Sequence, residues 1–428
     1  MRRPILLFLA FAFGYFFSAL LRAVTATLAP QFSLELGLGA ADLGLLAGVF
    51  FAGFASMQLP LGSALDRMGP KRVLLGMMGV AVLACAAFAL AQSFAALLVA
   101  RTLMGAGLSA GLMAALTCFR HAYSPVVQMR ATSWMLMTGS LGMLMSTMPV
   151  HALLPLVGWR GLFWLAAAGI AACAAFIWLA VPQDRPVLPG PAPSGRGAAL
   201  PQPVFDAPHA GYSLIFRHPT FLRLAPMGFW HYGGLVAVQA LWAGPWFSEV
   251  TGLDAAGSAR GLFVVNLAML VAFASLGALV PRLAAQGWNA QRLIGWACPI
   301  STALLFTVAA LGPEAGPVIM ALWCVSCVAL SLSQPALGQA FPAHLVGRAL
   351  SAFNLVIFLG VFSVQWGLGL IIDMLAAQGW QRLQTFQGAF AALAGCCGLS
   401  YLWFLRANPA GRGHATSASQ PQGGKIGG

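Results

Sequence analysis

Arg22 is the residue of this chain whose type and position most directly suggest chemistry. Residues 4–29 form a mostly apolar run of membrane-spanning length, and Arg22 lies beyond its middle. A guanidinium at that depth is costly unless it faces a wet cavity, where it can bind an anion. Tyr15 and Ser18 precede it by seven and four residues, spacings that predict one shared helical face. These three side chains are a candidate anion-binding site, with snorkelling of Arg22 towards an interface as the alternative.

A second set of polar residues stands in the apolar run at residues 221–247. His231 lies near its middle, and Gln239, Trp242 and Trp246 follow at spacings that predict one face. An imidazole that titrates near neutrality can carry a coupling proton. A histidine held by hydrogen bonds between helices is the alternative, and the sequence leaves both open. Single polar residues in later apolar runs complete the predicted binding set: Asn266, Gln334, Asn354 and Gln365.

Some of these residues could instead be ligands of a soft metal ion. Met227 and His231 are four residues apart, and Cys324 and Cys327 form a Cys-x-x-Cys pair in another apolar run. Thioether and imidazole ligands suit Cu(I). Because methionine is also a common filler of apolar cores, we predict no metal site and no cofactor. Copper binding at Met227 and His231 stays an alternative.

The positions of the acidic residues limit the class of solute that the chain could carry. The chain has nine Asp and Glu residues, and none falls in the middle of an apolar run. With Arg22, and with Arg101 in the fourth run, the field of a central cavity should be positive, which favours anionic or zwitterionic solutes. An exporter of cationic drugs usually needs a buried carboxylate, so this class is disfavoured.

The elements that must position these residues are membrane-spanning helices. Hydrophobic residues make up 60% of the chain and charged residues 7%, and the mean hydropathy is +0.84, which excludes an ordinary soluble globular protein. Apolar stretches of about 18 residues or more predict an all-α membrane protein of twelve spans in two six-helix bundles. The stretches are residues 4–29, 42–65, 73–91, 94–119, 132–154, 160–181, 221–247, 258–280, 293–312, 315–340, 349–375 and 384–405.

Polar segments divide the chain and set its orientation. Residues 182–218 predict a cytoplasmic linker between an N-terminal bundle, 1–181, and a C-terminal bundle, 219–406, and residues 407–428 predict a disordered tail. Most Lys and Arg fall in loops on the side of the N-terminus. The opposite face keeps only Arg160, Arg260 and Arg382. This asymmetry predicts cytoplasmic termini and accounts for the net charge of +13, so no nucleic-acid partner is expected.

Residues 62–72, called the signature segment below, join the second and third apolar runs. Their pattern G-x-x-x-D-R-x-G-x-K-R resembles the signature loop of the major facilitator superfamily, a family of secondary transporters. The resemblance implies a cytoplasmic latch between the two bundles, whose acid faces the start of the eleventh helix near Ala349. The residues assigned to this gate are Gly62, Asp66, Arg67, Gly69, Lys71 and Arg72, with Arg130 as an ion-pair partner.

Two further segments resemble the same family. The run Arg101-Thr-Leu-Met-Gly105 is similar to a motif in which the arginine is linked to proton coupling, although the family often has glutamine at Met104. Arg101 and Gly105 are therefore assigned to coupling, with a snorkelling Arg101 as the alternative. An aromatic pair, Arg22 and a later proline resemble the first helix of organophosphate:phosphate antiporters, whose arginine binds phosphate. Their second arginine, on the seventh helix, is missing here, because Arg223 lies at the cytoplasmic end.

The predicted function is secondary active transport of a small organic anion or zwitterion by alternating access, with the two bundles rocking around a midplane site. No nucleotide-binding pattern occurs, so coupling to H⁺ or exchange is expected. The chain is expected to be a monomeric, non-enzymatic protein of a bacterial inner membrane, with the bilayer and a small-molecule substrate as partners. A copper importer of the same family and a multidrug or metabolite exporter are the alternatives.

Overall fold

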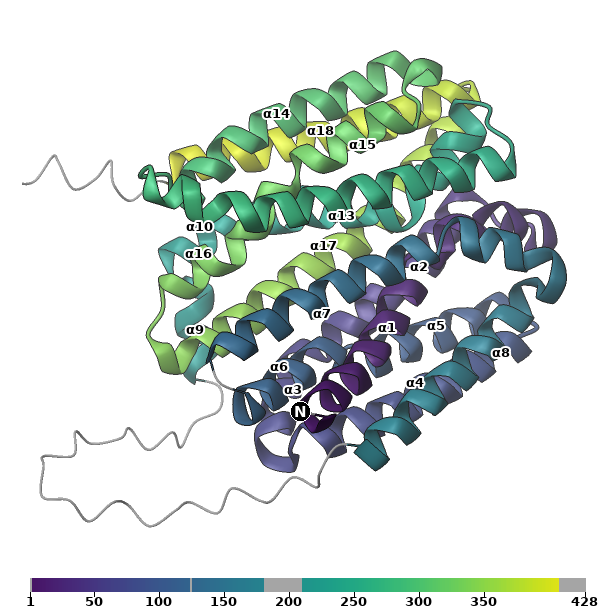
Figure 1. Ribbon diagram of the computed structural model, residues 1–428. Coiled ribbons are helices and arrows are strands. Elements are labelled where there is room, and N and C mark those ends of the chain that lie inside the picture. Colours follow the sequence, from purple (N-terminus) through teal and green to yellow (C-terminus); the bar gives the residue numbers. More distant parts are fainter. Residues whose placement is uncertain (1, 124, 181–209, 408–428) are drawn as a thin grey trace, which may run out of the picture.

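The computed structural model describes residues 2–123, 125–180 and 210–407, and every regular element in these ranges is a helix. The N-terminal elements, purple to blue in Figure 1, form one bundle, and the C-terminal elements, teal to yellow, form a second bundle beside it. This arrangement confirms the predicted all-α, two-bundle fold class. The predicted linker and tail fall mostly at 181–209 and 408–428, outside the described residues.

The N-terminal bundle follows the predicted spans with two adjustments. Met57 interrupts the second span, and Gly158, with a φ of 65°, divides α8 into an outer segment and a spanning helix. The predicted span 132–154 is therefore wrong at its end, because the helix stops at Met145 and the chain turns before Met148. The elements are α1 (Arg2–Leu36), α2 (Ala40–Ser56), α3 (Gln58–Met68), α4 (Pro70–Leu90), α5 (Phe94–Leu108), α6 (Gly111–Ala122), α7 (Pro125–Met145) and α8 (Met148–Ala180).

The C-terminal bundle contains one unusual element, called helix 7 below, which spans residues 219–250. It begins as α10 (Pro219–Met227) and continues as η1 (Gly228–Tyr232), α11 (Gly233–Ala237), η2 (Val238–Trp242), α12 (Ala243–Pro245) and η3 (Trp246–Val250), where all three η segments are π-helical. The other elements are α9 (Ala210–Arg217), α13 (Ala255–Ala285), α14 (Ala290–Leu311), η4 (Gly312–Glu314), α15 (Pro317–Ser326), η5 (Val328–Leu332), α16 (Ser333–Gln339), α17 (Ala343–Ala377) and α18 (Arg382–Arg406).

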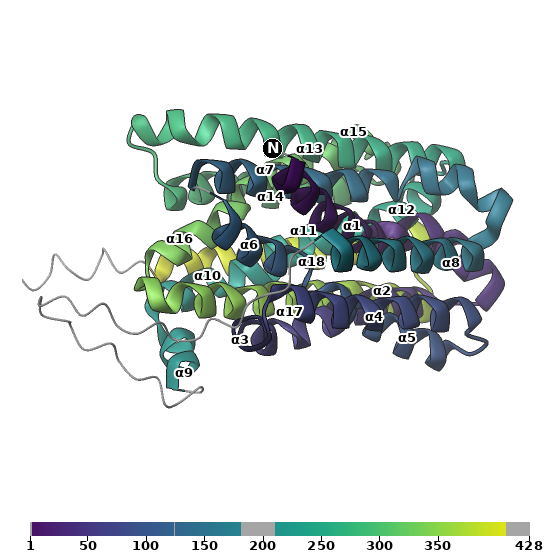
Figure 2. The same ribbon diagram turned by 60° about the horizontal axis from the view of Figure 1, so that its bottom comes forward.

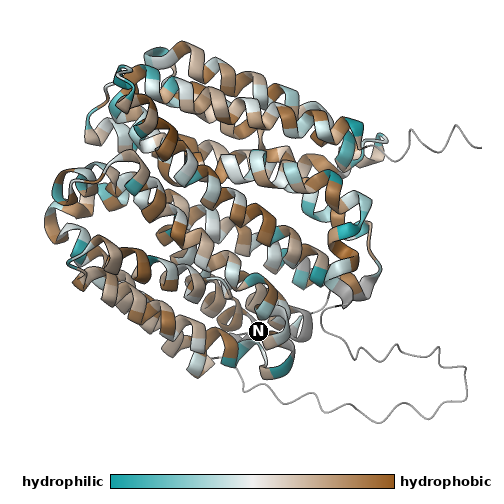
Figure 3. Ribbon diagram, turned by 180° about the vertical axis from the view of Figure 1, so that it is seen from behind, coloured by the Kyte–Doolittle hydropathy of each residue, from teal (hydrophilic) through white to brown (hydrophobic). Residues whose placement is uncertain are grey.

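Helices of membrane-spanning length and composition occur in both bundles. Ten helical stretches of the described residues are long and apolar enough to cross a membrane. The two remaining predicted spans correspond to α7 and to helix 7, so the fold is consistent with twelve spans. Figure 3 shows apolar residues along the lengths of the helices and hydrophilic residues gathered mainly at their ends. Large apolar side chains such as Leu83, Trp178 and Trp296 are exposed, as contact with lipid requires.

The two bundles meet along a seam between α2 and α17, which lie side by side in Figures 1 and 2. Gly44 faces Gln365 and Gly369 faces Ala40, so the two helices run antiparallel. A Cβ atom on Gly44 would overlap the carbonyl oxygen of Gln365, which means that the backbones touch there. A second contact places Gly244 of helix 7 against the carbonyl of Ala26 in α1. Both contacts lie towards the predicted outer face, where the bundles are closed against each other.

Candidate substrate-binding and gating site

Arg22 projects from α1 towards the seam between the bundles. Its guanidinium carbon lies 5.8 Å from the ring centroid of Phe54 on α2, and that ring packs 4.5 Å from the ring of Phe358 on α17. The Nε atom of Arg22 is buried and has no hydrogen-bond partner. Neither of the ion pairs between described residues includes Arg22. The structure thus places a half-buried cation at the boundary of the two bundles, and no carboxylate among the described side chains pairs with it.

The predicted partners of Arg22 on α1 each contact a different helix of the N-terminal bundle. The hydroxyl of Ser18 donates a hydrogen bond to the carbonyl of Leu108, 3.1 Å away inside the N-terminal bundle. Tyr15 packs against Gly111 and Gly139, on α6 and α7. α1 is an uninterrupted α-helix over these residues, so the three side chains lie on one face as predicted, but different neighbouring helices contact them. A phenol that the sequence analysis missed, Tyr232 on helix 7, lies within electrostatic range of both Tyr15 and Arg22.

Arg101 is buried in the N-terminal bundle, with 1% of its surface exposed, which rules out the snorkelling alternative. Its Nη2 atom donates to the carbonyl of Leu21 at 2.9 Å and to the hydroxyl of Thr25 at 2.6 Å. The guanidinium also lies 5.0 Å from the ring centroid of Phe50. Since Leu21 and Thr25 flank Arg22 in the sequence, Arg101 fixes the part of α1 that presents Arg22.

Helix 7 sends its polar side chains in different directions. His231 faces α14 and α18, Gln239 donates to Asn266 on α13 at 3.0 Å, and the Trp242 indole donates to the carbonyl of Gln365 at 3.0 Å. The Trp246 indole donates instead to the carbonyl of Ala315. These side chains do not point to one common face, because the π turns of helix 7 are wider than α turns: His231 lies within η1, η2 follows it, and Trp246 begins η3.

Polar pairs between helices account for most of the remaining predicted binding residues. The side-chain amide of Gln334 donates to Asn354 on α17 at 3.0 Å, just as Gln239 donates to Asn266. Gln365 differs, because its side chain is fully buried and both of its polar atoms lack a hydrogen-bond partner. Of these residues, Gln365 is the one with unused hydrogen-bonding capacity.

His231 is held by two hydroxyl groups within the C-terminal bundle. Its Nδ1 atom lies 3.1 Å from Ser400 Oγ and its Nε2 atom 3.2 Å from Thr302 Oγ1, so both ring nitrogens are satisfied. His231→Ala would leave a cavity and remove the imidazole partner of both hydroxyls, of which Ser400 still donates to the Cys397 carbonyl at 2.8 Å. We expect it to lower the free energy of unfolding by about 2 kcal/mol, seen as a lower Tm in detergent, with transport kept by the folded fraction.

The control for this prediction is His151→Ala, since His151, in the first segment of α8, is half-buried and its side chain makes no hydrogen bond among the described residues, while its backbone amide donates to the Thr147 carbonyl. Its Tm should stay close to that of the unmodified chain. Transport lost without any change in Tm in His231→Ala would contradict the structural role and favour the proton-carrier interpretation.

The signature segment is almost entirely helical rather than a loop. α3 ends at Met68, Gly69 turns the chain with a φ of 81°, and Pro70 begins α4. Lys71 is buried and donates from Nζ to the carbonyl of Trp178 at 2.8 Å, so it ties the segment to the end of α8. Of the other predicted gate residues, Arg67, Arg72 and Arg130 are exposed at the surface. A Cβ atom on Gly62 would meet no atom within 4 Å. The side chain of Asp66 lies outside the described residues.

Gly105, also assigned to coupling, is a packing residue in the structure. A Cβ atom there would overlap the carbonyl oxygen of Phe50, and one on Gly53 would overlap that of Thr102. These two glycines let α2 and α5 cross with their backbones in contact. The contact fixes the orientation of α2, whose other side faces α17 and Arg22.

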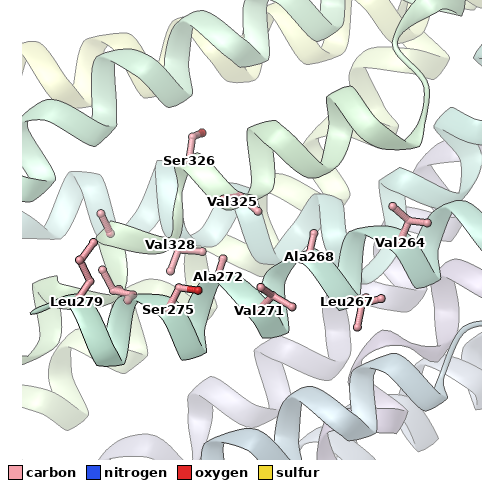
Figure 4. Close-up of a pocket in the computed structure, with 12 residues that line it drawn as sticks. Val264, Leu267, Ala268, Val271, Ala272, Ser275, Leu279, Val325, Ser326 and Val328 are labelled. Carbon is pink, nitrogen blue, oxygen red and sulfur yellow. The ribbon is translucent and has the colours of Figure 1, made fainter.

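Two cavities formed by described residues have no Met, His or Cys in their lining. The larger, of about 670 Å³, lies between α13 and the junction of α15 and η5 (Figure 4), and apolar side chains such as Val271, Ala272 and Val328 line it. A smaller one, of about 230 Å³, lies at the outer seam. No group of three or more His, Cys, Asp or Glu side chains in the described ranges could hold a metal ion. The imidazole nitrogens of His231 already contact hydroxyls, which leaves Met227 without its expected co-ligand.

Two helical bundles with exposed apolar side chains, in contact along the glycine-lined seam of α2 and α17 and with the half-buried Arg22 at their boundary, are typical of a multi-pass membrane transporter. The chain belongs to the Major Facilitator Superfamily, whose family model matches residues 11–365. It is accordingly a protein of the secondary transporter type.

Solved structures are similar over nearly the whole chain. A D-xylose–proton symporter matches with a TM-score of 0.73 at 15% identity, covering 96% of this chain and 99% of its own. A bacterial homologue of the human lysosomal transporter Spinster, inward-facing and occupied, gives 0.71 at 16% identity, covering 95% and 97%. The nucleoside transporter NupG gives 0.72 at 13% identity, covering 95% and 99%. No curated protein sequence matches the chain. At such low identities, the likeness establishes the fold alone.

Proposed function

We propose that the protein transports a small organic anion or zwitterion, and that Arg22 binds its anionic group. The observation that carries this proposal is the unbalanced guanidinium of Arg22 at the boundary of the two bundles. A cation at membrane depth is costly without a partner, and a substrate anion would supply one. Tyr232 lies within electrostatic range of Arg22 and of Tyr15, and the phenols of both tyrosines are suitable hydrogen-bond donors to that anion.

The distribution of charge supports the same substrate class. The described acidic side chains that form ion pairs, Glu35 and Glu249, lie at the outer ends of helices with Arg160 and Arg382. Arg101 adds a second buried cation to the N-terminal bundle. The field near Arg22 is therefore positive, which attracts anions and opposes cationic drugs. A metabolite exporter for anions would use the same site, so the direction of transport is a separate question.

Alternating access gives this site its transport function. We propose that residues 1–181 and 219–406 rock against each other about the level of Arg22, exposing it in turn to each side. The driving force is exchange with a second anion or cotransport of H⁺. Exchange has the simpler chemistry here, because it needs no additional titrating group beside Arg22. Both termini face the cytoplasm in this proposal, in a bacterial inner membrane, and the monomer is the transporting unit.

A ligand screen followed by a flux assay tests the proposal. Purified protein is heated with mono- and dicarboxylates, organophosphates, amino acids, neutral sugars, nucleosides, lipophilic cations and Cu(I), and its Tm is recorded. We expect stabilisation by one group of anions or zwitterions, and counterflow of the same compounds in proteoliposomes. Stabilisation only by neutral solutes, cations or Cu(I) would overturn the proposal.

A further inference from the structure

The Asp373 carboxylate joins the two bundles at the outer end of the seam. It stands near the end of α17, and its Oδ1 atom accepts a hydrogen bond from the Ala40 amide at 3.2 Å, while Oδ2 accepts from the Ala41 amide at 2.8 Å. Ala40 and Ala41 are the first two residues of α2. A side chain of the C-terminal bundle thus caps a helix of the N-terminal bundle.

The start of α2 is built to receive this carboxylate. The first amides of a helix have no partner within the helix, and a negative charge there is stabilised by the helix dipole. The N-cap residue is Gly39, which has no side chain to satisfy these amides itself. A Cβ on Gly39 would lie 3.2 Å from Oδ2 of Asp373, so glycine also leaves room for the acid. The ion pairs between described residues join Arg160 to Glu35 and Arg382 to Glu249, and neither includes Asp373.

The position of this contact connects it to the outer closure. It lies one turn beyond the place where Gly369 meets Ala40, and it borders the 230 Å³ outer cavity that residues of both bundles line. Water in that cavity can reach the carboxylate. The outer side cannot open unless α2 leaves α17, and this separation must break both hydrogen bonds of Asp373.

We propose that Asp373 is a gating residue that holds the outer side closed, and that its contact with α2 is broken and remade in each transport cycle. The proposal does not depend on which solute is carried. It adds an outer gate to the cytoplasmic one that the signature segment implies. Asp373 stands near the end of α17 that contacts the start of α2, whereas Asp66 stands in α3, which follows α2 after Met57.

Hydrogen–deuterium exchange of the full chain in nanodiscs tests this role without a ligand. Asp373→Ala should raise amide exchange about tenfold on both sides of the seam, as expected for loss of a helix cap worth about 0.5–2 kcal/mol. The decisive peptides are residues 24–33 of α1 and 243–250 of helix 7, which include the Ala26–Gly244 contact but do not bind Asp373. Faster exchange there reports opening of the whole outer side.

Asp254→Ala is the matched control. Asp254 caps α13 within its own bundle by accepting from the Gly257 amide at 2.7 Å, so its loss should raise exchange only at the start of α13. Asp373→Asn, which keeps one acceptor oxygen but loses the charge, should give an intermediate increase. Exchange in Asp373→Ala that is unchanged, or raised only at residues 40–42, would overturn the proposal and leave Asp373 as a local cap.

Discussion

Arg22→Ala is expected to abolish substrate binding while the protein still folds. Among the described residues the guanidinium makes no hydrogen bond or ion pair, so its removal mainly loses its packing on Phe54. A charged group that pairs with a ligand anion typically contributes about 2–5 kcal/mol to binding. We therefore expect affinity to fall by about 100-fold or more, with uptake lost at normal substrate levels. Thermal stabilisation by the substrate and counterflow in proteoliposomes are the two measurements.

Two variants separate charge from general effects at this site. Arg22→Lys keeps the positive charge but not the planar guanidinium, and should retain part of the affinity. Arg282→Ala removes an exposed arginine at the end of α13 and should leave affinity unchanged. If Arg22→Ala binds and transports the identified substrate as well as the unmodified chain does, the site must be sought elsewhere, with Gln365 as the next candidate.

Gly105→Ala has the second large expected effect, on folding rather than on binding. The added methyl group would overlap the Phe50 carbonyl oxygen, which belongs to rigid helical backbone and cannot rotate away. The helices α2 and α5 would have to separate, at a cost of about 3 kcal/mol, the upper end of typical overpacking effects. We expect little monodisperse protein on size-exclusion chromatography, and a strongly lowered Tm for any that is recovered.

Gly79→Ala is the control for this substitution. Gly79 also lies within a spanning helix, α4, but a Cβ there would meet nothing within 4 Å. It should keep the yield and Tm of the unmodified chain. A normal yield and Tm for Gly105→Ala would show that α2 and α5 are less tightly packed than the structure indicates, and would restore the interpretation of Gly105 as a coupling residue.

The sequence predicted the spans well, and the side-chain neighbours poorly. Long apolar runs identify spanning helices because the bilayer imposes their length and composition, whatever they pack against. Neighbours depend on helix rotation and on contacts between distant segments. Ser18 illustrates this, since its spacing from Arg22 predicted a cavity position and its hydroxyl instead donates to Leu108. Arg101 was assigned to coupling from its motif, and its partners Leu21 and Thr25 could not be read from one sequence.

Helix 7 shows where regular periodicity fails as a guide. Its side chains were assigned to one face on the assumption of an α-helix, and π turns have no clear signature in the sequence. Asp373 was missed for a different reason. It stands outside the apolar middle of its helix, where acids are ordinary, and its significance comes only from Ala40 and Ala41, more than 330 positions away in the chain.

The π-helical turns of helix 7 also have a mechanical consequence. A π turn contains roughly one residue more than an α turn, so converting η1, η2 or η3 to α geometry would displace one residue and rotate the rest of the helix by about 100°. Helix 7 can therefore shift its register by one residue along its own axis when a π turn converts to an α turn. Such a conversion would turn Trp242 and Trp246 relative to Met227 while the helix stayed continuous. Deleting a single residue within η2 would impose that rotated register permanently.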